Sequence, residues 1–251
     1  MILIGLSTFR ELLRQKLVHI ILFLAGLILA VSFMAGTLSL GEEDRILFHF
    51  GFSAVQLALV GISLFVGSIT IPREIERQTC LIVLTRPIDR LQFYLGKWLG
   101  VAAVNAVIVV SLTLILWFAV GVKDSFWTVS KVGLGIYFES LILLALAFWS
   151  SMFLRSAISL FFSMGIFILG HWLNELVYFA EKSKIEINIL LSKVIHAIVP
   201  QLYRTDWKSF YLLENNLISS TEFLTVTLHA AGWILLLLVL GVWNFRRKDL
   251  V

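Results

Sequence analysis

The sequence PREIERQTCLIVLTRPIDRLQFYLGK, residues 72–97, joins two long apolar stretches and is charged at its beginning and around an Arg-Pro step. Pro72 suits the first turn of a helix, where its missing N–H has no partner in any case. Glu74 and Glu76 follow where the helix dipole favours anions. The Arg-Pro step at 86–87 ends the helix, because a residue before proline is pushed away from the α region. We therefore expect a short polar helix to begin at Pro72.

A second helix start follows this turn. Asp89 and Gln92 are three residues apart and form a capping-box pattern. The helix that they begin runs past Lys97 into the next apolar stretch. The segment thus predicts a polar helix, a sharp turn and a rigid helix into the membrane, a shape on which a soluble partner could push. An ordinary amphipathic connector between two spans is the alternative.

The composition excludes a soluble globular protein. Hydrophobic residues make up 59% of the chain and the mean hydropathy is +0.95, which leaves too little polar surface to cover a globule in water. Cys80 is the only cysteine, so the chain has no internal disulfide and no multi-thiolate metal site. The pI of 9.3 follows from Arg and Lys at the ends of spans. We therefore expect membrane lipids, and no nucleic acid, as partners.

The apolar runs predict an all-α polytopic membrane protein that forms a single domain over residues 1–251. Each run is long enough to cross a hydrocarbon core of about 30 Å. The expected six spans are residues 17–40, 46–71, 99–122, 132–154, 157–179 and 223–243.

Charges beside these spans predict the topology. Basic residues precede the first span and follow the last, so the positive-inside rule places both termini in the cytoplasm, at the inner membrane of a bacterium or archaeon. The basic segment 72–97 then also lies inside, and the net acidic turn at 41–45 lies outside. Residues 180–222 fall outside although they carry several lysines, because acidic residues balance these and long loops cross largely regardless of charge.

Residues 1–16 are predicted to form an interfacial helix on the inner membrane face. Leu6, Phe9 and Leu13 recur at helical spacing, and polar and basic residues occupy the opposite side. Such a helix dips its apolar side into the acyl boundary while its basic residues meet anionic headgroups. A simple extension of the first span into the cytoplasm is the alternative.

Ionisable residues inside the spans suggest a polar layer. Glu139 and His229 lie about 12 and 9 Å below the outer ends of their spans, and His171 lies about 21 Å above the inner end of its own. These depths nearly coincide, and Asn174 and Glu175 follow on the next helical turn. We expect Glu139, His171 and His229 to face the protein interior. The layer is open to three interpretations: a substrate or proton site, interhelical hydrogen bonds, or a copper or zinc site.

The outer segment, residues 180–222, has two parts. Residues 185–198 carry apolar side chains at helical spacing, which predicts an interfacial or re-entrant helix. Residues 200–216 interleave aromatic and charged side chains, a mixture that suits the headgroup level. A loop resting on the bilayer surface remains the alternative.

The charged segment resembles the coupling region of type-2 ABC export permeases. The shared pattern is a Glu with a nearby Thr at 76–79, a Leu-x-Arg-Pro-Ile step at 84–88, Arg90, and Gly96 followed by Lys97. The usual Gly before the Thr is replaced by Gln78. Six spans, a long outer segment before the last one and a basic C-terminus agree with this layout. The step Ile-Val-Pro-Gln-Leu at 198–202 is most similar to permeases linked to copper-enzyme maturation.

The resemblance implies a permease subunit that dimerises with a second copy or a paralogue, through spans one, two and five, and binds two copies of an ABC ATPase. A phosphate-binding Gly-x-x-x-x-Gly-Lys-Ser/Thr loop is not present in this sequence. ATP and Mg²⁺ would therefore be bound by the partner, and the chain itself holds no cofactor and is not an enzyme. The resemblance implies an ATPase coupling role for Arg73, Glu74, Glu76, Arg77, Thr79, Arg86, Pro87 and Arg90.

Two functions remain open at this point. The first is an exporter permease that moves a substrate outward, and the second is an ATPase-driven membrane scaffold or mechanical transmitter without a translocated solute. A secondary transporter would need a more polar midplane and internal repeats, which the sequence does not show. Its Ser, His and acidic residues lie on separate spans and form no catalytic motif.

Overall fold

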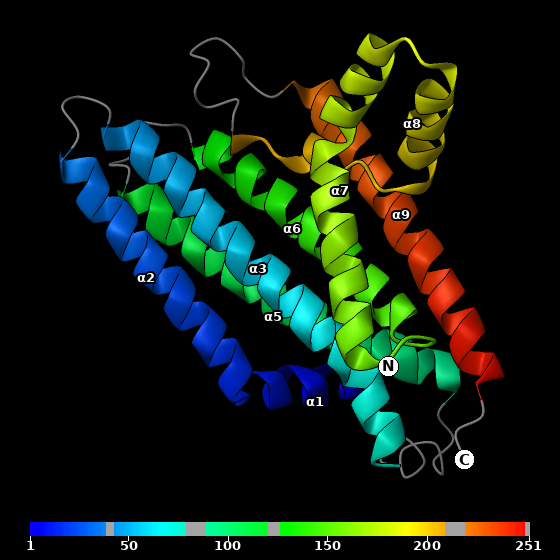
Figure 1. Ribbon diagram of the computed structural model, residues 1–251. Coiled ribbons are helices and arrows are strands. Elements are labelled where there is room, and N and C mark those ends of the chain that lie inside the picture. Colours follow the sequence, from blue (N-terminus) through cyan, green and yellow to red (C-terminus); the bar gives the residue numbers. More distant parts are fainter. Residues whose placement is uncertain (39–42, 79–88, 120–125, 209–218, 249–251) are drawn as a thin grey trace.

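A computed structural model describes residues 1–38, 43–78, 89–119, 126–208 and 219–248 (Figure 1). Within these ranges the regular elements are α-helices and one short 3-10 helix, and no strand is formed. Their bounds are α1 Ile2–Leu12, α2 Lys16–Leu38, α3 Glu43–Glu76, α5 Arg90–Ala119, α6 Phe126–Ser150, α7 Ser156–Ser183, α8 Glu186–Ile198, η1 Leu202–Thr205 and α9 Ser220–Arg247.

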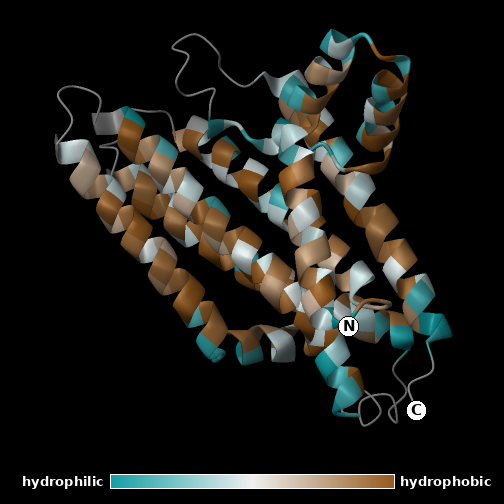
Figure 2. Cartoon of the chain, viewed as in Figure 1, coloured by the Kyte–Doolittle hydropathy of each residue, from teal (hydrophilic) through white to brown (hydrophobic). Residues whose placement is uncertain are grey.

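Six of these helices, α2, α3, α5, α6, α7 and α9, are long and apolar enough to cross a membrane. This confirms the prediction of an all-helical protein with six spans. Hydrophobic residues dominate the middle of each long helix and hydrophilic residues gather toward the ends (Figure 2). The N-terminus and the last residues of α9 lie at the same end of the bundle, which we call the terminal end (Figure 1).

Helix α6 forms the centre of the bundle and contacts α3, α5, α7 and α9. In the most apolar 18-residue stretch of α6, 78% of the residues are buried. In the corresponding stretches of α2 and α9 only 17% are buried. Asn105 of α5 joins this core to α3, because its amide donates a 2.7 Å hydrogen bond to Ser63 Oγ. The helices with little burial, α2, α7 and α9, therefore present apolar faces to lipid or to another subunit.

The helix expected to begin at Pro72 is in fact the end of α3, which continues through Pro72 to Glu76. Proline removes one backbone donor from a helix, but the neighbouring side chains hold this turn against the bundle. Ile71 is fully buried and Ile75 packs on the core. The expected polar helix is thus part of a 34-residue rod. Its last expected residues, 79–84, lie outside the described part of the chain.

Helix α5 begins at Arg90, directly after Asp89, as the capping pattern predicts. Helix α1 is separate from α2 and lies across the terminal end of the bundle against α5 (Figure 1). The contact uses two glycines of α5: a Cβ at Gly96 would lie 2.9 Å from Ile4 Cβ, and one at Gly100 would lie 2.6 Å from Thr8 Cβ. Leu6 and Leu13, on the predicted lipid-facing side of α1, remain exposed.

Helices α7 and α8 pack against each other at the end of the bundle opposite the termini (Figure 1). Lys184, in the left-handed conformation with φ 54°, ends α7 and reverses the chain. Helix α8 then covers residues 186–198, in agreement with the helix predicted at 185–198. After Pro200 the chain turns inward toward α6 and α7.

Candidate functional site

Residues 200–208 pass between α6 and α7, and two glycines make room for them. A Cβ at Gly170 of α7 would lie 2.8 Å from the Pro200 carbonyl oxygen, and one at Gly135 of α6 would lie 2.6 Å from the Thr205 carbonyl oxygen. Distances this short leave no space for a larger residue, so the backbone reaches this depth only beside glycine. Leu202, Thr205 and Trp207 are buried in consequence. We call residues 200–208 the inserted segment.

The inserted segment carries Lys208 into a buried polar cluster with Gln56 of α3 and Glu139 of α6. The Gln56 amide nitrogen donates to both Glu139 carboxylate oxygens, at 3.0 and 2.9 Å. The Gln56 amide oxygen accepts a hydrogen bond from the Lys208 ammonium. Gln56 therefore bridges an ammonium and a carboxyl group, because its amide oxygen accepts from the first and its amide nitrogen donates to the second.

His171 of α7 and Asp206 complete this group, which we call the Gln56 cluster. His171 Nε2 lies 3.6 Å from Glu139 Oε1 and 3.4 Å from the Gln56 amide nitrogen. Its Nδ1 lies 3.1 Å from the Phe167 carbonyl oxygen, which can only accept, so we assign the proton to Nδ1. Asp206 Oδ1 is 3.6 Å from Lys208 Nζ and accepts the Lys208 backbone N–H.

Burial makes the charges of the Gln56 cluster energetically important. Glu139 is 0% exposed, Lys208 7% and Gln56 9%. Unpaired charges in such surroundings are costly, whereas paired and hydrogen-bonded ones are tolerated. Two carboxyl groups, those of Glu139 and Asp206, and the His171 imidazole surround one ammonium. The cluster therefore holds α3, α6, α7 and the inserted segment together through polar contacts inside the membrane-spanning bundle.

The structure brings together two residues of the predicted polar layer, Glu139 and His171. His229 is half-buried on α9 beside Trp233, and its buried Nε2 has no hydrogen-bond partner in the described part of the chain. Asn174 and Glu175 are exposed on α7. Among the described residues, no group of three His, Cys, Asp or Glu side chains converges as metal ligands would.

Gln56 and Lys208 are not among the residues of the predicted polar layer. Gln56 is the only glutamine in its apolar run, which is a signal that the sequence offered. Lys208 offered none, because it lies among other charged and aromatic residues of the outer segment and its burial depends on how the inserted segment is threaded.

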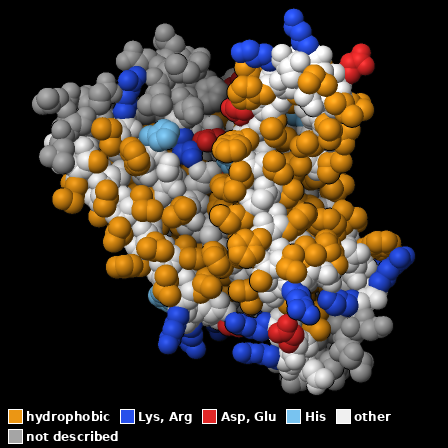
Figure 3. Space-filling view, in the orientation of Figure 1, with side chains coloured by type: hydrophobic (Ala, Val, Ile, Leu, Met, Phe, Trp, Pro, Cys, Tyr) orange, Lys and Arg blue, Asp and Glu red, His pale blue; other side chains and the backbone are white. Residues whose placement is uncertain are grey.

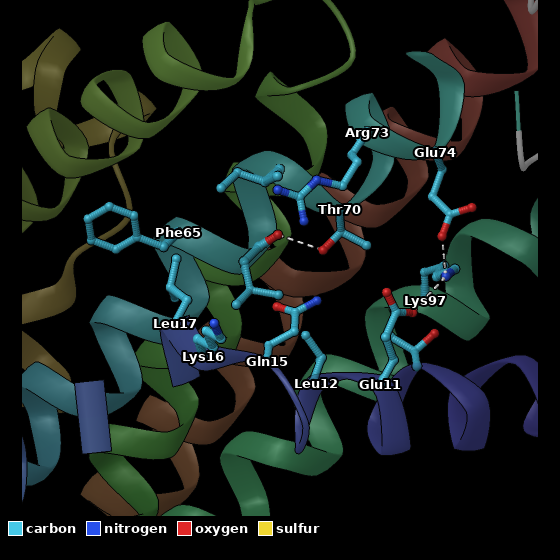
Figure 4. A pocket seen from close by; sticks show the side chains of 13 residues that line it. Glu11, Leu12, Gln15, Lys16, Leu17, Phe65, Thr70, Arg73, Glu74 and Lys97 are labelled. Atoms are coloured by element: carbon cyan, nitrogen blue, oxygen red, sulfur yellow. Dashed lines mark hydrogen bonds and ion pairs between the residues drawn. The ribbon is translucent and has the colours of Figure 1, made fainter. Parts of the chain in front are cut away.

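Lys97 joins three helices at the terminal end of the bundle (Figure 4). Its ammonium lies 2.6 Å from Glu74 Oε1 at the end of α3 and 3.9 Å from Glu11 Oε2 on α1. Lys97 itself starts from α5 and is 7% exposed, so the short contact with Glu74 is shielded from water and resists screening. Lys97 therefore links the end of α3 to α5 by a short ion pair and contacts α1 at a longer distance.

Arg90 makes a second connection at this end. Its guanidinium donates to the carbonyl oxygens of Phe245, Arg246 and Lys248 at 3.4, 3.0 and 3.0 Å, and so satisfies the last carbonyls of α9. The Lys248 ammonium donates to the Met152 carbonyl oxygen, just after α6, at 2.7 Å. The start of α5, the end of α9 and the turn between α6 and α7 are thus tied together.

The residues predicted to couple to an ATPase therefore occupy different surroundings. Glu74 and Arg90 make contacts within the chain, whereas Arg73, Glu76 and Arg77 are exposed around the end of α3. Thr79, Arg86 and Pro87 lie outside the described residues. Among the predicted residues that are described, the surface available to a partner is the tip of α3.

A family model described as ABC-2 family transporter protein matches residues 6–250, nearly the whole chain. No curated protein matches the sequence.

Proposed function

This chain belongs to the ABC-2 family of transporter proteins, and from that membership we propose that it is the transmembrane subunit of an exporter driven by a separate ABC ATPase. Membership and the six apolar helices make it a multi-pass permease component of an ABC transporter. The ATPase binds ATP and Mg²⁺ and supplies the energy. The permease supplies the passage and the surface on which the ATPase acts.

We place the terminal end of the bundle in the cytoplasm of a bacterial or archaeal cell. Lys and Arg side chains gather along this end of the face shown in Figure 3, while hydrophobic side chains cover its middle. Such an asymmetry supports the orientation through the positive-inside rule. The tip of α3 then meets the soluble ATPase, and the α7–α8 pair lies outside.

The observation that carries the proposal is the continuity of α3. One helix bears the exposed Glu76 at its tip, directly before Arg77, and also Glu74 paired with Lys97 and Gln56 in the buried cluster. Gln56 and Glu76 are twenty residues apart, or about 30 Å along a helix. A push on the tip therefore reaches the amide that holds Lys208, because an uninterrupted helix moves largely as a rigid body.

Outward movement of a substrate then requires the inserted segment to leave its place between α6 and α7. In this conformation Lys208 fixes the segment to α3 through Gln56. Displacement of α3 by the ATPase separates Gln56 from Lys208 and loosens the outer half of the bundle. We propose that the Gln56 cluster is the outer lock of the permease.

A complete passage is expected to need two copies of this chain, or one copy and a paralogue, with two ATPase copies. In the most apolar 18-residue stretches of α2 and α7, only 17% and 22% of the residues are buried. This low burial supports a role for these helices in contact with another subunit. By family resemblance, spans one, two and five form that interface.

Charge reversal at the tip of α3 tests the proposed function. The variants Glu76→Arg and Arg77→Glu are compared with Lys193→Glu, an exposed position on α8 at the opposite end. We expect the tip variants to lose co-purification with the cognate ATPase, or its coupled export, while all three variants insert normally. Normal co-purification and normal export in both tip variants would contradict the proposal.

A further inference from the structure

A cleft of about 190 Å³ opens between α1, the start of α2 and the end of α3 (Figure 4). One part of its wall is polar and includes Gln15, Lys16 and Arg73, whereas Leu17 and Phe65 form an apolar part. The lock does not use this cleft, which shares Arg73 with the exposed surface around the end of α3 but does not include Glu76 or Arg77. We refer to it as the α1–α3 cleft.

The charged side chains of the α1–α3 cleft that make no ion pair within the described part of the chain are basic. The ammonium of Lys97 is taken up by Glu74 and Glu11, which also line the wall. Lys16 and Arg73 are exposed and make no ion pair within the described part of the chain. They approach the cleft from α2 and α3. An ammonium and a guanidinium on the wall of one cleft are the groups that bind phosphate, Arg in a bidentate manner and Lys as a point charge.

The cleft also lies at a membrane boundary. Lys16 is the first residue of one span, and Arg73 lies within the last turn of another. From this level the apolar wall leads toward the middle of the membrane, where Phe65 is 43% exposed and α2 buries little of its surface. A molecule that fills both parts has an anionic head and an apolar tail.

We propose that the α1–α3 cleft binds an anionic phospholipid, with the headgroup phosphate between Lys16 and Arg73 and an acyl chain along Leu17 and Phe65. The proposal does not depend on the proposed export function, because headgroups occupy this level in either orientation of the chain. The bound lipid stabilises the arrangement of α1 beside the end of α3, since its headgroup lies next to the Lys97–Glu74 pair.

Lipid binding is measured on the purified full-length chain in detergent, by native mass spectrometry with phosphatidylglycerol and phosphatidylcholine added at matched concentrations. The double variant Lys16→Gln/Arg73→Gln is compared with Lys182→Gln/Lys193→Gln, which removes two exposed charges at the opposite end. We expect phosphatidylglycerol to bind the wild type and the control about tenfold more tightly than it binds the cleft variant. The affinity for phosphatidylcholine should differ much less among the three proteins.

Thermal unfolding of the same proteins, with inorganic phosphate or phosphatidylglycerol added, separates a free anion from a lipid. If phosphate alone stabilises the wild type against heat as strongly as phosphatidylglycerol does, and the cleft variant loses both effects, the site belongs to a soluble anion and the lipid proposal is overturned. Equal phosphatidylglycerol binding by the cleft variant and the control would also overturn it. The single variant Arg73→Gln, at an exposed position, provides the comparison if the double variant folds poorly, and an intermediate loss is then expected.

Discussion

Replacement of Lys208 by methionine tests the outer lock directly. Methionine keeps most of the side-chain length but removes the ammonium, so Gln56 Oε1 loses its donor and the Asp206 and Glu139 carboxylates lose the neighbouring cation. Removal of the donor from a buried acceptor costs about 1–3 kcal/mol. For a chain of this size that loss corresponds to a fall of roughly 2–12 °C in the unfolding midpoint, at about 2–4 °C per kcal/mol.

The assay is thermal unfolding of the purified protein in detergent, with Lys193→Met as the matched control. Lys193 is exposed on α8, and such surface changes usually alter stability by less than about 0.5 kcal/mol. Addition of Glu139→Gln to Lys208→Met should recover part of the loss, because the uncompensated carboxylate is then gone. The double-mutant cycle should give a coupling of at least about 1 kcal/mol. If Lys208→Met is as stable as Lys193→Met, the cluster does not hold the inserted segment and the reasoning fails.

Two further substitutions address the cluster and the terminal end. Glu139→Gln should lower export without affecting membrane insertion. The loss of export should depend on external pH, because the Glu139 carboxyl group and His171 form one protonatable pair. Unaltered export at every pH would mean that the cluster serves helix packing alone. Gly100→Leu should detach α1 from α5, because a Cβ at Gly100 would lie 2.6 Å from Thr8 Cβ. The distance between spin labels on α1 and α5 should then increase, and an unchanged distance would refute the glycine contact. Gly232→Leu is the control, since no atom lies within 4 Å of a Cβ at Gly232.

The sequence was sufficient for the number and the approximate bounds of the spans, because hydrophobic length is a local property. It was misleading at Pro72. A proline looks like a helix start when only its own backbone is considered, whereas the buried Ile71 and the packed Ile75 keep α3 continuous. Local chemistry predicts where a helix is able to end, and tertiary packing decides whether it does.

The candidate site was only partly accessible from the sequence. Glu139 and His171 were predicted to lie at a similar depth in the membrane. Depth follows from the position of a residue along its span, because the rise per residue is fixed in a helix. The direction in which each side chain faces is set by packing, so depth alone did not separate these two from the exposed Asn174 and Glu175. Lys208 reaches the cluster only because Gly170 and Gly135 admit the inserted segment, a contact between residues far apart in the chain.

Site-specific photocross-linking measures most directly whether an ABC ATPase acts on the tip of α3. A photoreactive amino acid is placed at Gln78, which is exposed just after α3, and in a second protein at Lys193 on α8. Each protein is expressed together with the cognate ATPase and irradiated in membranes. We predict a cross-link to the ATPase from position 78 and none from position 193. A cross-link from position 193, or none from position 78 in a complex that still co-purifies, would contradict it.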